Sequence, residues 1–268
     1  MKIKLTLLAL TPMLLLGACS RETNKEQSEL TDTKDINTVL LSLESKSKEV
    51  KNFELTYKND NETYDEDLLA NVKRHTEYVF QMNEDNEVYM HSISKYDGEE
   101  TSTISDFYLV RNDKYETVMY SSINYGDYQE LSVLSQKNNP DLLTYAEIYV
   151  AIPKIYFEAF VNPSNIEDSL PVNTSTHDIE TKYYSSGINN LTIKINYSLK
   201  RDAIILSNEV ASTGTYTINY DKGYLKDVVV EATSSKGNKS KTEIGLTKKD
   251  KFRINLPDNW EDVIDKGE

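Results

Sequence analysis

The stretch Asn190–Leu199, NLTIKINYSL, decides the fold class because apolar and polar residues alternate through it without a break. A period of two is typical of a β-strand with one buried face and one solvated face. The apolar residues that fall on one face of such a strand are Leu191, Ile193, Ile195, Tyr197 and Leu199. The sequence therefore predicts a strand of an antiparallel sheet here.

The same alternation continues towards the C-terminus and predicts consecutive hairpins. TYTINY (215–220) is followed by DKG (221–223), a tripeptide suited to a turn, and then by YLKDVVVEA (224–232). KTEIGLTKK (241–249) follows after a polar connection. Phe252, Ile254 and Leu256 alternate as well and are candidates for a last strand.

The N-terminal half predicts an antiparallel meander. Short runs rich in tyrosine and β-branched residues alternate with polar loops, which is typical of consecutive strands. We expect the segment 59–73, NDNETYDEDLLANVK, to be an acidic loop, with a short helical turn as an open alternative. The predicted strands are NFELTYK (52–58), HTEYVFQM (75–82), EVYMHSI (87–93), DFYLV (106–110), YETVMYS (115–121) and YQELSVLSQ (128–136).

Two segments have helical spacing instead. In 35–50 we expect a helix with Asp35 as its N-cap; its apolar face would hold Ile36, Val39, Leu40, Leu43 and Val50. In 139–165 we expect a helix that Pro153 kinks or divides. Residues 201–210 fit either a strand or a short helix. The order of helix, strands, helices and strands excludes βαβ repetition, so a parallel doubly wound sheet is not expected.

The first 19 residues predict a secretory signal peptide that ends at a lipidation site. Two early lysines precede an apolar run over 5–16, which is shorter than the roughly 20 residues of a spanning helix. LGAC (16–19) resembles the bacterial lipobox, which implies cleavage between Ala18 and Cys19 and a diacylglyceryl cysteine carrying palmitate-type chains. Two alternatives stay open: ordinary signal peptidase could remove Cys19, or the apolar start could be a chance feature of a cytosolic protein.

This prediction divides the chain into three parts. Residues 1–18 would be the signal peptide, 19–34 a lipidated N-terminus with a flexible polar tether, and 35–268 one domain. The protein would then lie on the extracytoplasmic face of a bacterial cell membrane, held by its acyl chains. Cys19 is the only cysteine, so we expect no disulfide and no cysteine-based metal site or nucleophile.

The charge of the chain narrows the class of partner. The net charge is −14, and it becomes −16 after removal of 1–18, which contain two lysines and no acidic residue. Such an excess of acids repels nucleic acid and argues against a basic membrane-binding patch. We therefore expect no nucleic-acid partner, and the sequence names no protein partner.

The layout resembles lipoproteins of the LolA/LolB-like superfamily, in particular its LppX/LprG-type members. The resemblance rests on the lipobox, the polar tether, the helix TVLLSLESKSKEV running into KNFELTYK, the meander, and the late hairpin GTYTINYDKGYLKDVVVEA. It implies an α+β, mainly β fold: a strongly curved antiparallel sheet that forms an incomplete barrel covered by helices. It also implies a cavity between sheet and helices that takes acyl chains or other apolar ligands.

A pocket of this kind would be lined by apolar residues of the sheet and of the middle helix. The alternative is that this helix fills the barrel as ordinary core. The candidate cavity-lining residues are Tyr145, Ile148, Tyr149, Ile152, Ile193, Ile195, Tyr216 and Ile218.

No catalytic constellation is visible in the sequence. The three histidines, His75, His91 and His177, lack a second histidine at metal-ligand spacing. The acidic run at 65–67 lacks the glycine and the spacing of a calcium loop. We therefore expect no enzyme activity, no cofactor and no metal. Two functions remain: binding of an apolar or amphiphilic ligand in the sheet–helix cavity, or a protein-interaction module of the cell envelope without a small ligand.

Overall fold

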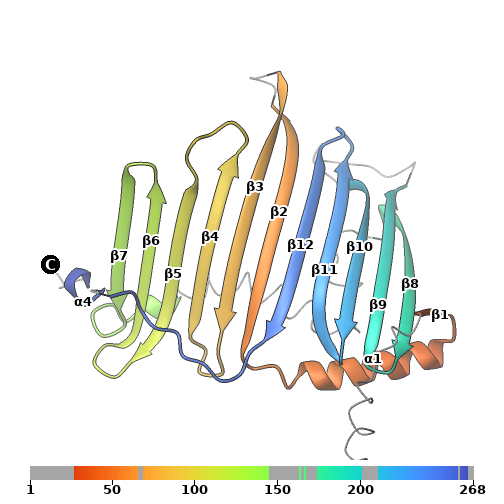
Figure 1. The fold of residues 1–268 in the computed structure, drawn as a ribbon, viewed down its shortest axis with the longest axis horizontal. Coiled ribbons are helices and arrows are strands. Elements are labelled where there is room, and N and C mark those ends of the chain that lie inside the picture. Colours follow the sequence, from red (N-terminus) through yellow and green to blue (C-terminus); the bar gives the residue numbers. More distant parts are fainter. Residues whose placement is uncertain are drawn as a thin grey trace, which may run out of the picture.

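The computed structural model describes residues 27–65, 69–144, 163, 166, 174–200, 211–258 and 260–264. In this part of the chain twelve strands form one antiparallel sheet in the order β1-β8-β9-β10-β11-β12-β2-β3-β4-β5-β6-β7. Figure 1 shows the sheet as one broad layer with β1 and β7 at its two edges. The prediction of a mainly β protein with an antiparallel sheet is confirmed, and the sheet is not closed.

The strands fall into two sequential groups. The first contains β2 (Phe53–Asp65), β3 (Ala70–Met82), β4 (Val88–Tyr96), β5 (Thr103–Asn112), β6 (Glu116–Tyr125) and β7 (Tyr128–Ser135). The second contains β8 (His177–Gly187), β9 (Asn190–Leu199), β10 (Ala211–Asp221), β11 (Tyr224–Ser234) and β12 (Lys239–Lys248), with β1 (Ser28–Leu30) added at its edge. Both predicted meanders are confirmed.

Pairing of β12 with β2 joins the two groups into one sheet. Ile244 of β12 lies opposite Tyr57 of β2, and Leu246 lies opposite Leu55. Residues almost 190 positions apart in the sequence therefore share the centre of the sheet.

One face of the sheet, which we call the core face, carries the main hydrophobic core. On β9 and β10 the alternation seen in the sequence places Ile193 opposite Ile218 and Ile195 opposite Tyr216, and all four are buried. The helix α1 (Thr33–Ser47) adds Val39, Leu40 and Leu43 to this core. Figure 1 shows α1 along the lower ends of the β8–β11 strands.

The opposite face, which we call the outer face, is mostly polar but carries a second, smaller core at one end. There Val118 of β6 and Val133 of β7 pack with Ile264, and Trp260 of α4 (Trp260–Val263) packs nearby. In Figure 1 the C-terminal chain passes the lower ends of the β3–β6 strands to reach β7. The C-terminus therefore covers the outer face at the β7 edge.

Three sequence predictions are wrong in detail. The N-cap of α1 is Asp32, whose Oδ1 accepts a hydrogen bond from the backbone N–H of Lys34 at 2.7 Å, and Asp35 lies in the first turn. Most of 59–73 is not a loop, because β2 and β3 continue through it and pair in register from Phe53 to Asp65. Polar residues extend this hairpin because both of its faces meet solvent there.

The predicted last strand at Phe252–Leu256 is also wrong, since this segment pairs with no strand. Both sides of β12 are already occupied by β11 and β2, so the chain that leaves β12 cannot add a strand there. It is fixed instead by Asn83, whose Nδ2 donates to the carbonyl oxygen of Phe252 at 3.1 Å.

Two strands were not expected from the sequence. The polar segment 19–34 contains β1, and β8 follows a stretch for which we predicted no element. β1 pairs with β8, with Leu30 opposite Tyr183. The predicted helix at 139–165 is helical at 142–144 but not at 139–141. Residues 145–162 and 164–165 lie outside the described residues, as does 201–210. Covering of the sheet by that helix therefore stays a prediction.

Candidate functional site

The predicted cavity-lining residues fall into two sets. Ile193, Ile195, Tyr216 and Ile218 lie together on the core face, each no more than 5% exposed. The other four, Tyr145, Ile148, Tyr149 and Ile152, lie outside the described residues. The sheet residues therefore belong to a packed core at this point, and their contact with a ligand stays a prediction.

On its other half, the core face carries both buried and half-buried apolar side chains. Phe53, Leu55, Phe80 and Phe107 are buried, whereas several of their neighbours on β2 to β5 are only half-buried. The rings of Tyr57 and Tyr78 meet edge to face at 5.5 Å between centroids. We call this set the half-buried patch; it comprises Tyr57, Tyr78, Met82, Met90 and Leu109.

Polarity changes along the strands of this half. One step above the patch, the core face carries hydroxyl side chains: Ser92 lies opposite Tyr78 and Ser105, and Ser94 lies opposite Thr76 and Thr103. The face therefore runs from apolar at its lower end to hydroxyl-rich at its upper end. A molecule with an apolar and a polar end matches this gradient.

The outer face carries a groove of about 600 Å³ across the upper ends of five strands. Tyr197 covers Gly214 on the core face, and it is not among the residues that line the groove. The groove therefore lies on the outer face. Its lining residues come from β10, β11, β12, β2 and β3 and, in the case of Asp97, from the turn after β4, and they are almost all polar. The residues that line it are Asp60, Asn61, Glu62, Lys73, Arg74, His75, Asp97, Thr213, Gly214, Thr215, Glu231, Ala232, Thr233, Lys239, Ser240 and Lys241.

Charges of opposite sign face one another across the strands of this groove. In one row, Glu62 of β2 lies between Lys239 of β12 and Lys73 of β3. In the next row, Asp60 lies between Lys241 and His75, and Glu231 of β11 lies beyond Lys241. Opposite charges on directly facing residues stabilise a sheet modestly. We call the seven residues the charge ladder: Lys239, Glu62, Lys73, Glu231, Lys241, Asp60 and His75.

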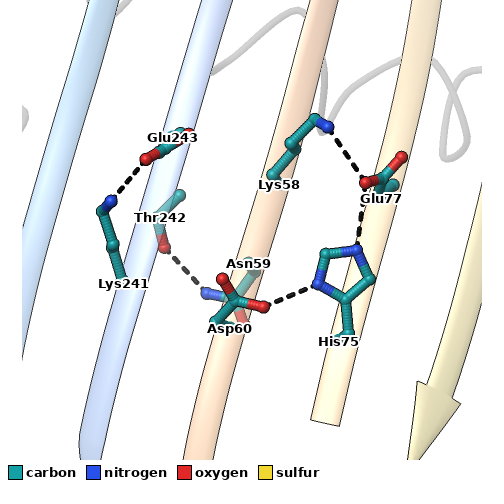
Figure 2. Close-up of polar contacts among 8 residues, drawn as sticks. All are labelled: Lys58, Asn59, Asp60, His75, Glu77, Lys241, Thr242 and Glu243. Atoms are coloured by element: carbon teal, nitrogen blue, oxygen red, sulfur yellow. Dashed lines mark hydrogen bonds and ion pairs between the residues drawn. The ribbon is translucent and has the colours of Figure 1, made fainter.

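His75 is held by two carboxylates, as Figure 2 shows. Its Nδ1 is 2.6 Å from Oδ1 of Asp60, and its Nε2 is 3.0 Å from Oε1 of Glu77. These hydrogen bonds raise the pKa of His75 above its usual value. Lys58, 3.0 Å from the same Glu77 oxygen, and His75 together lower the pKa of Glu77. On the other side His75 faces Lys95 of β4.

Two cations of the charge ladder remain available. Lys241 pairs with Glu243 at 2.6 Å (Figure 2), whereas Lys73 and Lys239 form no ion pair within 4.0 Å among the described residues. Arg74 donates from Nε to Ser94 at 3.0 Å and lies over the ring of Tyr96. The groove can therefore offer both free ammonium groups and carboxylates to a polar partner.

A second, shallow groove of about 620 Å³ lies where the chain enters the domain. It runs between α1 and the β1–β8 edge and is lined by Leu30, Asp35 and Val39 on one side and by residues 185–188 on the other. Gln27, just before β1, donates a hydrogen bond from Nε2 to the hydroxyl of Thr192 at 3.1 Å. The first described residue is thus fixed to the sheet.

The described residues contain no group of three or more His, Cys, Asp or Glu side chains placed to hold a metal ion. His91 instead pairs with Asp106 at 2.9 Å, and His177 contacts Thr176 at 2.9 Å. Nor is any helix in the described ranges long and apolar enough to cross a bilayer.

Sequence reasoning missed the groove because it treated 59–73 as a loop. Alternating charged residues in 58–62, 73–77 and 239–243 were the available clue. Without the pairing of β12 with β2 and of β2 with β3, nothing in the sequence brings these three segments together.

Comparison with known proteins assigns no family. No family profile matches the chain, and no curated protein matches it. Among solved structures, the chain is similar to a DUF1329 family protein from Desulfovibrio piger, with 8% sequence identity and a TM-score of 0.25, over 85% of this chain and 95% of that one. A likeness at this level carries no functional argument, so the resemblance to the LolA/LolB-like superfamily stays a prediction.

Proposed function

We propose that this protein is a membrane-anchored extracytoplasmic lipoprotein that binds an apolar or amphiphilic molecule, such as a lipid or lipopeptide, on the core face of its sheet. The observation that carries the proposal is the half-buried patch. Tyr57, Tyr78 and Met90 are apolar, face the core side, and are nevertheless incompletely covered. Apolar surface of this kind is typical of ligand sites.

The composition of the patch suits a ligand of variable shape. Methionine side chains are flexible and polarizable, so Met82 and Met90 can adapt to different acyl chains. Tyrosine offers a broad apolar ring and a hydroxyl that can hydrogen-bond a polar group. The hydroxyl-rich strip above the patch, with Ser92 and Ser105, would receive the polar end of an amphiphile.

The anchor would be the acylated Cys19, a proposal that rests on the lipobox. From Cys19 to Ser28, the first residue of β1, there are 28 − 19 = 9 residue steps. An extended chain of this length spans at most about 30 Å. The β1 edge and α1 would therefore lie within that distance of the bilayer, and a ligand drawn from the membrane would have a short path to the domain.

Displacement of a fluorescent fatty acid tests the ligand site. We expect the detergent-solubilised protein to bind cis-parinaric acid, and Met90→Gln to weaken binding about three- to ten-fold because it makes the patch polar. Ile93→Gln is the matched control, since Ile93 is half-buried on the other face of the same strand. Absence of binding by the wild-type protein, or equal effects of both substitutions, contradicts the proposal.

A second candidate function is a protein-interaction module that uses the charge ladder. The observation in its favour is the pair of ammonium groups on Lys73 and Lys239, which lack ion pairs among the described residues. A pull-down from the native cell envelope tests it: Lys73→Gln with Lys239→Gln should release a partner that Lys34→Gln with Lys51→Gln retains. Retention by both variants would exclude the groove as the contact.

A further inference from the structure

The two edges of the sheet differ in whether another strand covers them. At one edge, β1 covers part of β8 by pairing with Tyr183, Tyr184 and Ser185. At the other edge, β7 pairs with β6 alone among the described residues. An uncovered edge strand presents unpaired backbone groups and is a template for another strand.

The sequence and register of β7 carry none of the features that keep an edge strand from pairing, although α4 packs beside β7 on the outer face. Its sequence, YQELSVLS, contains no lysine and no proline, and its register with β6 has no bulge. Natural proteins use these devices to block edge-to-edge association. The single charge, Glu130, accepts a hydrogen bond from the hydroxyl of Tyr128 at 2.9 Å.

Exposed apolar side chains gather on both faces beside this edge. Tyr128 is 58% exposed and Tyr125 45% on the core-face side, and Leu131 is 36% exposed on the outer face. Ile123 of β6 and Val263 of α4 are also exposed, at 40% and 42%. An edge flanked by apolar residues on both sides is typical of an interface rather than of a solvated edge.

We propose that β7 pairs with the β7 strand of a second copy of this chain, antiparallel about a two-fold axis at Leu131. Each Leu131 then lies opposite the partner's Leu131 on the outer face. On the core face Tyr128 lies opposite the partner's Leu134, and Glu130 lies opposite the partner's Ser132. The two sheets become one continuous sheet, which is the self-complementary contact that a two-fold axis requires.

The position of Glu130 disfavours the two neighbouring axes. Only registers in which the paired residues differ by an even number keep the two core faces on the same side, because side chains alternate along a strand. An axis at Glu130 would place the two carboxylates opposite each other, which is destabilising. An axis at Ser132 would place Glu130 against the partner's Leu134, an unpaired charge against an apolar side chain.

Disulfide trapping tests the proposal directly. Facing residues of an antiparallel pair have Cα atoms about 4.5–5.5 Å apart, within the range of a disulfide. We expect Leu131→Cys to form a covalent dimer under mild oxidation. Ile188→Cys, which introduces a more exposed thiol in the turn between β8 and β9, is the control and should stay monomeric. The wild-type chain reports any contribution from Cys19, its single cysteine.

Sedimentation velocity of the detergent-solubilised full chain gives a second, independent measurement. We expect a dimer that Leu131→Lys converts to a monomer, because two ammonium groups would face each other across the axis, and that Ile188→Lys leaves intact. Added salt should favour the dimer, since each copy carries a net charge of −14. A monomer at every concentration, a dimer insensitive to Leu131→Lys, or equal cross-linking of both cysteine variants overturns the proposal.

Discussion

The phenol ring of Tyr197 lies directly against the backbone of Gly214, the residue opposite it on the neighbouring strand. A Cβ atom at Gly214 would collide with this ring and with the carbonyl oxygen of Glu231. Tyr197 is buried and also packs near Tyr216 and His177, so it has little room to move. The absence of a side chain at Gly214 is therefore what allows the core face to close over the upper end of β10.

Replacing Gly214 should accordingly destabilise the fold. We expect Gly214→Ala to lower the free energy of unfolding by about 1–3 kcal/mol, the usual effect of overpacking a core. Urea denaturation followed by circular dichroism measures it. Thr213→Ala, at the exposed neighbouring position, is the control and should change stability by less than about 0.5 kcal/mol. Equal stability of the two variants would show that Tyr197 can move aside.

The buried carboxylate of Glu87 should be required to fix the C-terminal segment. It accepts hydrogen bonds from Asn83 Nδ2 at 2.7 Å, from the backbone N–H of Arg111 at 3.3 Å and from that of Ile254 at 3.4 Å. Glu87→Ala leaves these donors without their acceptor, which costs about 1–3 kcal/mol for each buried group left unsatisfied.

Trp260 provides a local readout of this loss. It is the only tryptophan, and it packs against Tyr115 at 5.6 Å between centroids. In Glu87→Ala we expect acrylamide to quench Trp260 fluorescence more strongly than in the wild type. Glu84→Ala removes a nearby carboxylate that pairs with Lys251 at the surface, and it should leave quenching unchanged. Unchanged quenching in Glu87→Ala would mean that α4 is held without this carboxylate.

The pairing of His75 should make stability depend on pH. Its pKa is raised in the folded protein above the unfolded value of about 6.5, because Asp60 and Glu77 accept hydrogen bonds from the imidazolium. The stabilisation is therefore complete below the unfolded pKa and is lost as the pH rises through the higher folded pKa. Because the side chain is 45% exposed, the effect should stay below about 1 kcal/mol.

Thermal unfolding of the wild type and of His75→Gln across this pH range measures the effect. The difference in Tm should be largest in acid and should vanish in alkaline solution. Lys95, which faces His75 from β4, opposes the protonated form. His75→Gln should therefore lower the Tm more in the Lys95→Gln background than in the wild-type background, and equal effects in both would mean that this repulsion is negligible. A difference that grows with pH would contradict the assigned pairing.

Local patterning predicted most of the sheet because its strands are consecutive hairpins. In β9 and β10 every second residue enters the core, and short turns such as the one at Lys222 and Gly223 leave little choice of partner. The join between β12 and β2 was not predictable, because no local signal pairs Ile244 with Tyr57. The polar ends of β2 and β3 were mistaken for a loop because they bury no apolar side chain.

In the candidate sites, too, features that depend on local sequence were predicted, and features that depend on long-range pairing were missed. Ile193 and Ile218 were predicted to face inwards, and they do, because that follows from alternation alone. The groove with Lys73 and Lys239 was missed, because its two sides come from strands that meet only through long-range pairing. The half-buried patch likewise depends on which part of the core face is covered, and alternation does not determine this.

Removal of Cys19 tests the anchor. If Cys19 carries acyl chains, Cys19→Ser should release the exported protein from the membrane, and in a detergent phase-partitioning experiment it should move from the detergent phase to the aqueous phase. Two acyl chains give stable anchoring because each buried methylene contributes about 0.8 kcal/mol. The folded domain should be unaffected, since its first described contact begins at Gln27.

Ser20→Ala, which changes the adjacent residue and leaves the thiol, is the matched control and should stay with the membrane. Aqueous partitioning of the wild-type protein would instead favour cleavage by ordinary signal peptidase, and the short path from bilayer to half-buried patch would then no longer hold.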